Sequence, residues 1–186
     1  MLSVPRARLL VPDRRLTLGE PTRVGQIVGG RFLGKIVRDS QVIDEFACEN
    51  IVVNQGLNYL LGAGLGAQSV TTAWYIGLFS NNYTILSSDT AATISANAGE
   101  TTQYTAGVRQ NWSSAPPASQ SITNSTTQAS FTFNATVTVY GAFLISSSAI
   151  NGTSGTLFSG AQFGSPKSVV NLDILLLTYT FTAASA

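Results

Sequence analysis

Alternating apolar and polar residues dominate the last third of the chain, and this period of two predicts β-strands. Strands are predicted over 131–133 and, after a turn at 134–135, over 137–145. We expect alternate residues of the longer strand to share one buried face: Val137, Val139, Gly141, Phe143 and Ile145. Apolar runs predict further strands at 157–163 and 169–170. A terminal strand over 174–181 is predicted with its own apolar side: Leu175, Leu177, Tyr179 and Phe181.

The first half of the chain predicts a hairpin, a helix and a buried strand. Strands over 32–37 and 42–53 are joined by polar residues at 39–41. Asn54 is a good N-cap residue, and the helix after it is expected to end at Gly62 and Gly64. Residues 74–79 predict a buried strand, 89–98 one or two helical turns, and 103–109 another strand. Two prolines mark 111–127 as an exposed connection.

These elements predict an all-β fold: an antiparallel β-sandwich or jelly roll with one short helix. A chain of 186 residues is long enough for one such domain with a substantial core. We assign the β-sandwich body to residues 30–186 and an extended N-terminal arm to residues 1–29.

The arm mixes cationic and apolar side chains. Pro5, Pro12 and Pro21 prevent a continuous helix and favour extended backbone. Such a peptide is typical of segments that add a strand to a partner or lie along a protein surface. The alternative is that it folds back on its own body. The candidate interface residues of the arm are Arg6, Arg8, Leu9, Leu10, Arg14, Arg15, Leu16 and Arg23.

Charge is concentrated in the first 50 residues of the chain. Charged residues make up 10% of the sequence, against about 25% in an average soluble protein. The first 50 residues hold eight of the 10 Lys and Arg and six of the 9 Asp and Glu. The body must therefore build its exterior from Ser, Thr, Asn, Gln and Gly, which suits a surface covered by neighbours because interface cores are depleted of charge. An ordinary Thr-rich β protein is the alternative.

The residues needed for chemistry are scarce. The chain has no His, and Cys48 is its only cysteine, which excludes His-dependent nucleophile pairs, His-ligated metals and an internal disulfide. Cys48 is expected to be a small buried side chain. Asp89 at a helix cap, Glu100 in a loop and Asp173 before a strand each have a structural explanation. We expect no catalytic residue, no metal site and no cofactor.

Membranes and nucleic acids are not expected partners. No apolar window of roughly 18 residues could span a bilayer, and Pro5, Arg6 and Arg8 interrupt any secretory signal, so we expect synthesis in a host cytoplasm. The arm is basic, but its apolar residues have no counterpart on a phosphate backbone, which makes nucleic acid an unlikely partner.

Four stretches of the body resemble virion structural proteins of tailed phages. They are residues 50–61 (NIVVNQGLNYLL), 74–79 (WYIGLF), 139–144 (VYGAFL) and 175–181 (LLLTYTF). The likeness runs from about Gly30 to the C-terminus and excludes the arm. It implies a jelly-roll capsid cement or decoration protein on the capsid exterior, bound to the major capsid protein and to itself as a dimer or trimer.

Two other functions remain as alternatives to a capsid protein. One is a tail component or adaptor, including a fibre-associated module that binds a host glycan through exposed Trp112, Tyr104 or Tyr83. Core packing is the alternative for these aromatic residues. The other is a carbohydrate-active enzyme.

Overall fold

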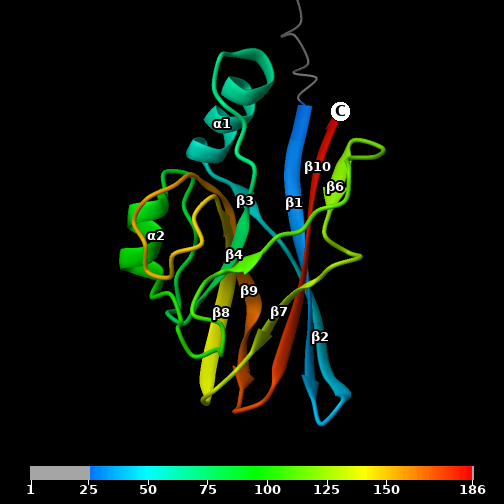
Figure 1. Cartoon of the computed structure of the whole chain (residues 1–186), viewed down its shortest axis with the longest axis vertical. Helices are drawn as coiled ribbons and strands as arrows, with labels where there is room; N and C mark the ends of the chain where they lie inside the picture. The colour runs from blue at the N-terminus through cyan, green and yellow to red at the C-terminus, as the bar shows by residue number, and fades with distance from the viewer. Residues whose placement is uncertain (1–25, 186) are drawn as a thin grey trace, which may run out of the picture.

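Two antiparallel sheets face each other in the computed structural model, which describes residues 26–185 (Figure 1). Sheet 1 has the strand order β2-β1-β10-β6, with β7 also paired to β10, and sheet 2 has the order β3-β9-β8-β4-β5. The strands are β1 (Gln26–Arg38), β2 (Gln41–Glu49), β3 (Ile51–Val52), β4 (Tyr75–Phe79), β5 (Gln110–Asn111), β6 (Ser121–Thr123), β7 (Ala129–Thr132), β8 (Val137–Ile145), β9 (Leu157–Val169) and β10 (Ile174–Ser185). The predicted all-β antiparallel sandwich is confirmed, and the jelly-roll connectivity stays a prediction.

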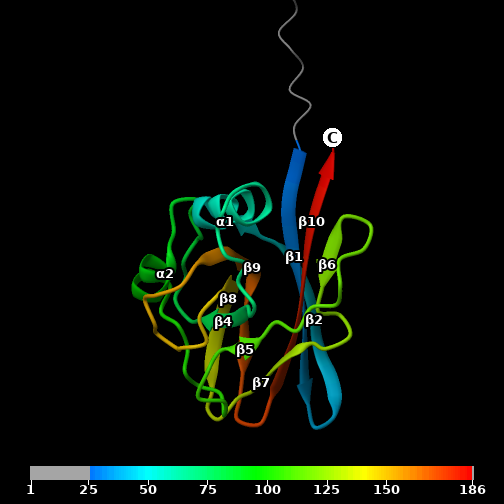
Figure 2. The ribbon, with the colours of Figure 1, turned by 45° about the horizontal axis from the view of Figure 1, so that its top comes forward.

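The first and last strands of the described chain form the middle of sheet 1. β1 pairs with β10 from Gln26 opposite Ser185 to Val37 opposite Ile174. Both ends of the described chain therefore lie side by side at one end of the molecule (Figure 2). Residues 26–29 pair with β10 as part of sheet 1, and the rest of the arm predicted over 1–29 lies outside the described residues.

The predicted hairpin is confirmed, but its second strand is shorter than expected. Asp39 and Ser40 have φ angles of 49° and 64°, the left-handed backbone that two-residue hairpin turns require. The single strand predicted over 42–53 breaks at Asn50, whose backbone N–H donates to Gly30 O. There the chain passes from sheet 1 into sheet 2 as β3, so one apolar run supplies strands to both sheets.

Two helices accompany the sheets. α1 (Asn54–Leu65) is confirmed, but Val53 is its N-cap residue, no side chain caps it, and the helix continues through Gly62 and Gly64. α2 (Ala91–Ala98) confirms the helical turns predicted over 89–98, and it gives the described chain a second helix where the fold prediction counted one. Its cap is Thr90, which forms a capping box with Thr93. The cap expected at Asp89 is therefore wrong by one residue.

The predicted single face of β8 is wrong. The pairing of β8 with β9 shifts register between Val139 and Gly141. Val139 packs in the core between the sheets, whereas Phe143 packs in a second cluster with Phe79 and Ile94 of α2. Sheet 2 is thus covered on both faces, which explains why every residue from Gly141 to Ile145 is buried.

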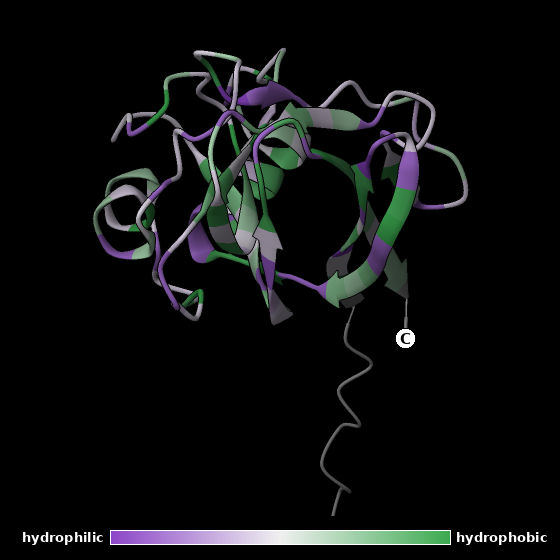
Figure 3. Cartoon of the chain, turned by 90° about the horizontal axis from the view of Figure 1, so that it is seen from below, coloured by the Kyte–Doolittle hydropathy of each residue, from purple (hydrophilic) through white to green (hydrophobic). Residues whose placement is uncertain are grey.

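Three other predictions for connecting segments need correction. Residues 103–109 form no strand: Tyr104 makes only an isolated bridge with Phe133. The connection at 111–127 contains β6. The separate strands at 157–163 and 169–170 are one strand, β9. The terminal strand is confirmed, with Leu175, Leu177 and Tyr179 fully buried on its inner side, where the two sheets face each other (Figure 3).

Candidate functional site

The candidate interface residues of the arm lie outside the residues that the structure describes. Arg6, Arg8, Leu9, Leu10, Arg14, Arg15, Leu16 and Arg23 all precede Gln26. The candidate site is therefore built from the surface of the body, beginning with its charged side chains.

Glu100 and Arg109 form a fully buried ion pair. Arg109 Nε and Nη2 donate to the two Glu100 carboxylate oxygens at 2.7 and 2.8 Å. Arg109 also donates to Ser147 O at 3.0 Å, and Glu100 accepts from Asn151 N at 2.6 Å. Partners on every side satisfy the pair, as a buried charge requires. The pair therefore joins the 100–110 loop to the 146–152 loop.

Asp173 is buried beside the half-exposed Arg38. Arg38 Nε and Nη2 donate to the two Asp173 carboxylate oxygens at 2.8 and 2.7 Å, and Val170 N donates at 2.8 Å. The hydrogen bond from Arg38 holds the pKa of Asp173 below its ordinary value, and burial opposes this only in part. Asp173 fixes the turn before β10, as the sequence predicted.

The other two charged residues beyond position 50 are also buried. Asp89 accepts hydrogen bonds from Leu86 N, the Tyr83 hydroxyl and the Thr93 hydroxyl. Lys167 pairs with Asp44 at 2.9 Å, and its ammonium lies 4.6 Å from the centroid of the Phe46 ring.

Residues 51–184 consequently expose no charged side chain. The charged residues in that range are all classed as buried: Asp89, Glu100, Arg109, Lys167 and Asp173. Every exposed or half-exposed charged side chain of residues 28–184 lies on the β1–β2 hairpin. Composition predicted a body with little charge, but only the fold reveals that this charge is internal. We call the exterior of residues 51–184 the uncharged surface.

The aromatic residues considered for glycan binding are largely internal. Trp112 is 8% exposed, and its indole N–H donates to Tyr179 O at 3.1 Å. Tyr104 is 3% exposed and packs edge-on against Phe131. Tyr83 is half-buried and bonded to Asp89. The exposure expected of Trp112 and Tyr104 is therefore wrong, because both fill the space between the sheets.

An apolar cavity of about 140 Å³ lies between α1 and the end of sheet 1. Aromatic and aliphatic side chains from both sheets and from α1 line it: Tyr59, Leu60, Trp74, Trp112, Ile122, Leu144, Phe158, Tyr179 and Phe181. On α1 and the segment after it, Leu61, Leu65 and Val70 are exposed by 60%, 88% and 67%. This end of the body offers apolar area to a neighbouring protein.

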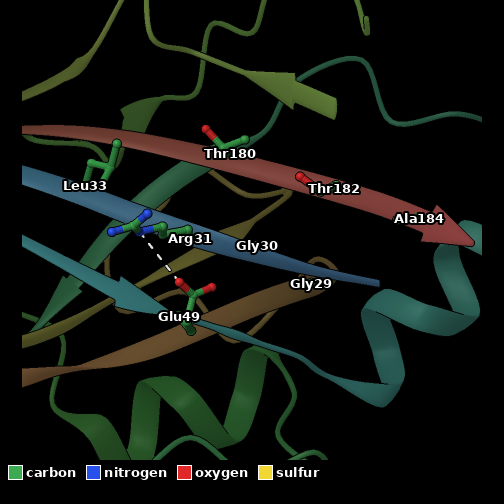
Figure 4. Close-up of a pocket in the computed structure, with 8 residues that line it drawn as sticks. All are labelled: Gly29, Gly30, Arg31, Leu33, Glu49, Thr180, Thr182 and Ala184. Atoms are coloured by element: carbon green, nitrogen blue, oxygen red, sulfur yellow. Dashed lines mark ion pairs between the residues drawn. The ribbon is translucent and has the colours of Figure 1, made fainter. Parts of the chain in front are cut away.

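A shallow hollow of about 470 Å³ lies on the outer face of sheet 1 (Figure 4). A Cβ atom at Gly29 would meet nothing within 4 Å, so the missing side chain leaves the surface open. Thr180, Thr182 and Ala184 of β10 lie on one side, and Arg31 contacts Glu49 at 3.6 Å on the other. The two charged residues that line the hollow, Arg31 and Glu49, are paired with each other.

Cys48 is half-buried, less enclosed than the sequence predicted. Burial and the nearby Glu49 raise the pKa of its thiol to about 11, so the thiol is protonated near neutral pH and a poor nucleophile. Within residues 26–185, no group of three or more Cys, Asp or Glu could hold a metal ion.

Comparisons with known proteins leave the identity open. No protein-family model matches the sequence, and neither does any curated protein. In the described part of the chain, no helix has the length and apolar character needed to cross a membrane.

Proposed function

We propose that this chain is a structural protein of a tailed-phage particle, most specifically a capsid cement or decoration protein. The observation that carries the proposal is the uncharged surface of residues 51–184. Charged groups are costly to remove from water, whereas hydroxyl and amide groups lose less on burial and form hydrogen bonds to a neighbour. A surface built in this way is suited to contact with several neighbours at once.

The proposed mechanism is thermodynamic. Pressure from a packaged genome pulls capsid subunits apart, and a protein that bridges them opposes the separation with interface area that exists only in the closed shell. The partners are the major capsid protein and further copies of this chain, as a dimer or trimer on a symmetry axis of the shell. The exposed apolar residues of α1 supply one contact area.

Copy number tests the proposed position. A cement protein is present on the order of hundreds of copies, as the equivalent sites of a symmetric shell require. Quantitative mass spectrometry of purified particles measures this number directly. A count that fits only the few rings of a tail would instead support the tail or fibre-associated adaptor, and absence from particles would refute both. Burial of Trp112 and Tyr104 removes the main support for a glycan-binding version of that adaptor.

A further inference from the structure

β2 is an open edge strand. It is the outermost strand of sheet 1, and its far edge pairs with no other strand in the described range. None of its nine residues is buried. Because half of the backbone groups of an antiparallel edge strand point away from its only partner, β2 presents a row of N–H and C=O groups that a further strand can pair with.

The edge is acidic. β2 carries Asp44, Glu45 and Glu49 and has neither Lys nor Pro, so the charges that protect it from unwanted pairing are all acidic. Glu45 pairs with Lys35 at 2.8 Å and Glu49 with Arg31 at 3.6 Å. Both glutamate side chains stay more than half exposed, at 59% and 79%. They disfavour pairing with a second β2 edge, and they favour a cationic strand only modestly because each already has a cation of its own chain beside it.

Residues 6–11 of the sequence match this edge. This stretch lies between Pro5 and Pro12, has no acidic residue, and places Arg6 and Arg8 two positions apart. Two positions is the spacing that brings side chains to the same face of a strand. The next proline-free stretch, 13–20, contains Asp13 and Glu20 besides Arg14 and Arg15, so its net charge is zero and it matches the edge less well.

An antiparallel register follows from the sequences. Pairing Leu10 with Ile43, which is 48% exposed, places Arg8 opposite Glu45 and Arg6 diagonal to Glu49. Each arginine then meets an acid, and the two apolar side chains cover each other.

We propose that β2 of one copy receives residues 6–11 of a second copy as an added strand. The choice of a second copy rests on the proposed function, in which copies lie close together on a shell. Strand exchange between neighbours then raises the effective concentration of every other contact in the lattice.

Disulfide trapping between two full-length variants tests the proposal. Both variants carry Cys48→Ala, which removes the only native cysteine. One also carries Arg8→Cys, and the other Glu45→Cys at an exposed position. Opposed residues of an antiparallel pair have Cα atoms about 5.5 Å apart or closer, within disulfide range. Mixed under mild oxidation, the two variants should form mixed dimers on a non-reducing gel.

The matched control replaces Glu45→Cys with Ala96→Cys, an exposed position on α2. We expect mixed dimers to form at least about tenfold faster with Glu45→Cys than with this control. Equal rates would overturn the proposal. A chain carrying both Arg8→Cys and Glu45→Cys should form dimers, and a link within one chain as its main product would also overturn it.

The trapping experiment tests the strand exchange separately from the proposed function, because it is done in solution without phage particles. Trapping in solution by a chain that is absent from particles would refute the proposed function and support the strand exchange. A chain found in particles but trapped only at the control rate would support the function and refute the exchange.

Discussion

The guanidinium of Arg109 connects parts of the body that are far apart in the sequence. It binds Glu100 nine positions earlier and the carbonyl oxygens of Ser147 and Gly152 later in the chain. It also lies 5.3 Å from the centroid of the Phe143 ring. At the scale of single residues, burial of charge with complete sets of partners is what leaves the body with an uncharged surface.

Replacing Arg109 alone should lower the free energy of unfolding strongly. Arg109→Met leaves the Glu100 carboxylate buried without its cation, and breaking a buried pair in this way costs about 3–5 kcal/mol of unfolding free energy. Lys35→Met is the control, because Lys35 and Glu45 form an exposed pair whose loss costs about 0–1 kcal/mol. Urea denaturation monitored by circular dichroism measures both values. Equal losses of unfolding free energy in the two variants would show that the buried pair stabilises the fold no more than the exposed pair does.

Asp173 should make the free energy of unfolding decrease as the pH falls into the acid range. The pKa of Asp173 is lowered in the folded state by its hydrogen bond from Arg38. A lowered folded pKa contributes stability that is complete above the unfolded pKa, about 3.9 for Asp, and is lost as pH falls through the folded pKa. Asp173→Asn should therefore flatten the loss of unfolding free energy below about pH 4. An unchanged acid profile in Asp173→Asn would contradict this assignment.

Sequence reasoning identified Asp173 as a structural turn residue because the signal is local: an acid directly before a strand. It could not find the partner of Glu100, because the loops that carry Glu100, Arg109 and Ser147 meet only after the strands have paired. The burial of Trp112 could not be predicted for a related reason. It follows a two-residue strand in a polar loop, and nothing nearby in the sequence indicates that its indole bonds to Tyr179 of β10.

At the scale of elements, β8 shows how one strand can serve two cores. Its sequence alternation predicts one buried face, but after the register shift between Val139 and Gly141 the odd-numbered Phe143 and Ile145 pack in the cluster with α2, while Ala142 and Leu144 pack in the core between the sheets. At Gly141 a Cβ atom would overlap the Phe79 ring and the Ala161 carbonyl oxygen, so only glycine fits at this point. The alternation of apolar and polar residues predicted where the long strands lie. It could not predict bulges or the passage of the chain from one sheet to the other, because these depend on contacts between residues far apart in the sequence.

Phe143→Asp should prevent folding. Phe143 is 1% exposed and packs against the cluster under α2, where a new carboxylate would lose its hydration and the nearby Arg109 is already paired with Glu100. The control is Ser168→Asp, an exposed residue of β9, which should change the unfolding free energy by less than about 0.5 kcal/mol. The yield of soluble protein and the near-ultraviolet circular dichroism spectrum report the result. A native-like Phe143→Asp protein would show that this strand is not in the core.

At the scale of the whole molecule, the exposed charge of the described residues is confined to one hairpin, whereas exposed apolar side chains are spread more widely. The β1–β2 hairpin carries the charge together with exposed Val42 and Ile43, and the most exposed leucine, Leu65, lies on α1. Composition predicted a body with little charge, but placing the exposed charge on a single hairpin required the fold. The jelly-roll connectivity and the phage resemblance remain predictions.

Deleting residues 1–25 should separate folding from assembly. β1 and its pairing with β10 begin at Gln26, so the shortened chain keeps every described strand. We expect a native circular dichroism spectrum and a loss of incorporation into particles. Deleting residues 1–29 is the comparison, because it also removes the pairing of Gln26 to Gly29 with β10 and should lower the melting temperature. Normal incorporation of the 26–186 chain would contradict the role given to the arm.

The most direct test of the proposed structural role is imaging of whole particles at a resolution that places this body. We predict copies on the exterior of the head, with the uncharged surface of residues 51–184 against capsid subunits and other copies of the chain. Particles that lack the chain, or copies whose uncharged surface faces solvent, would contradict it.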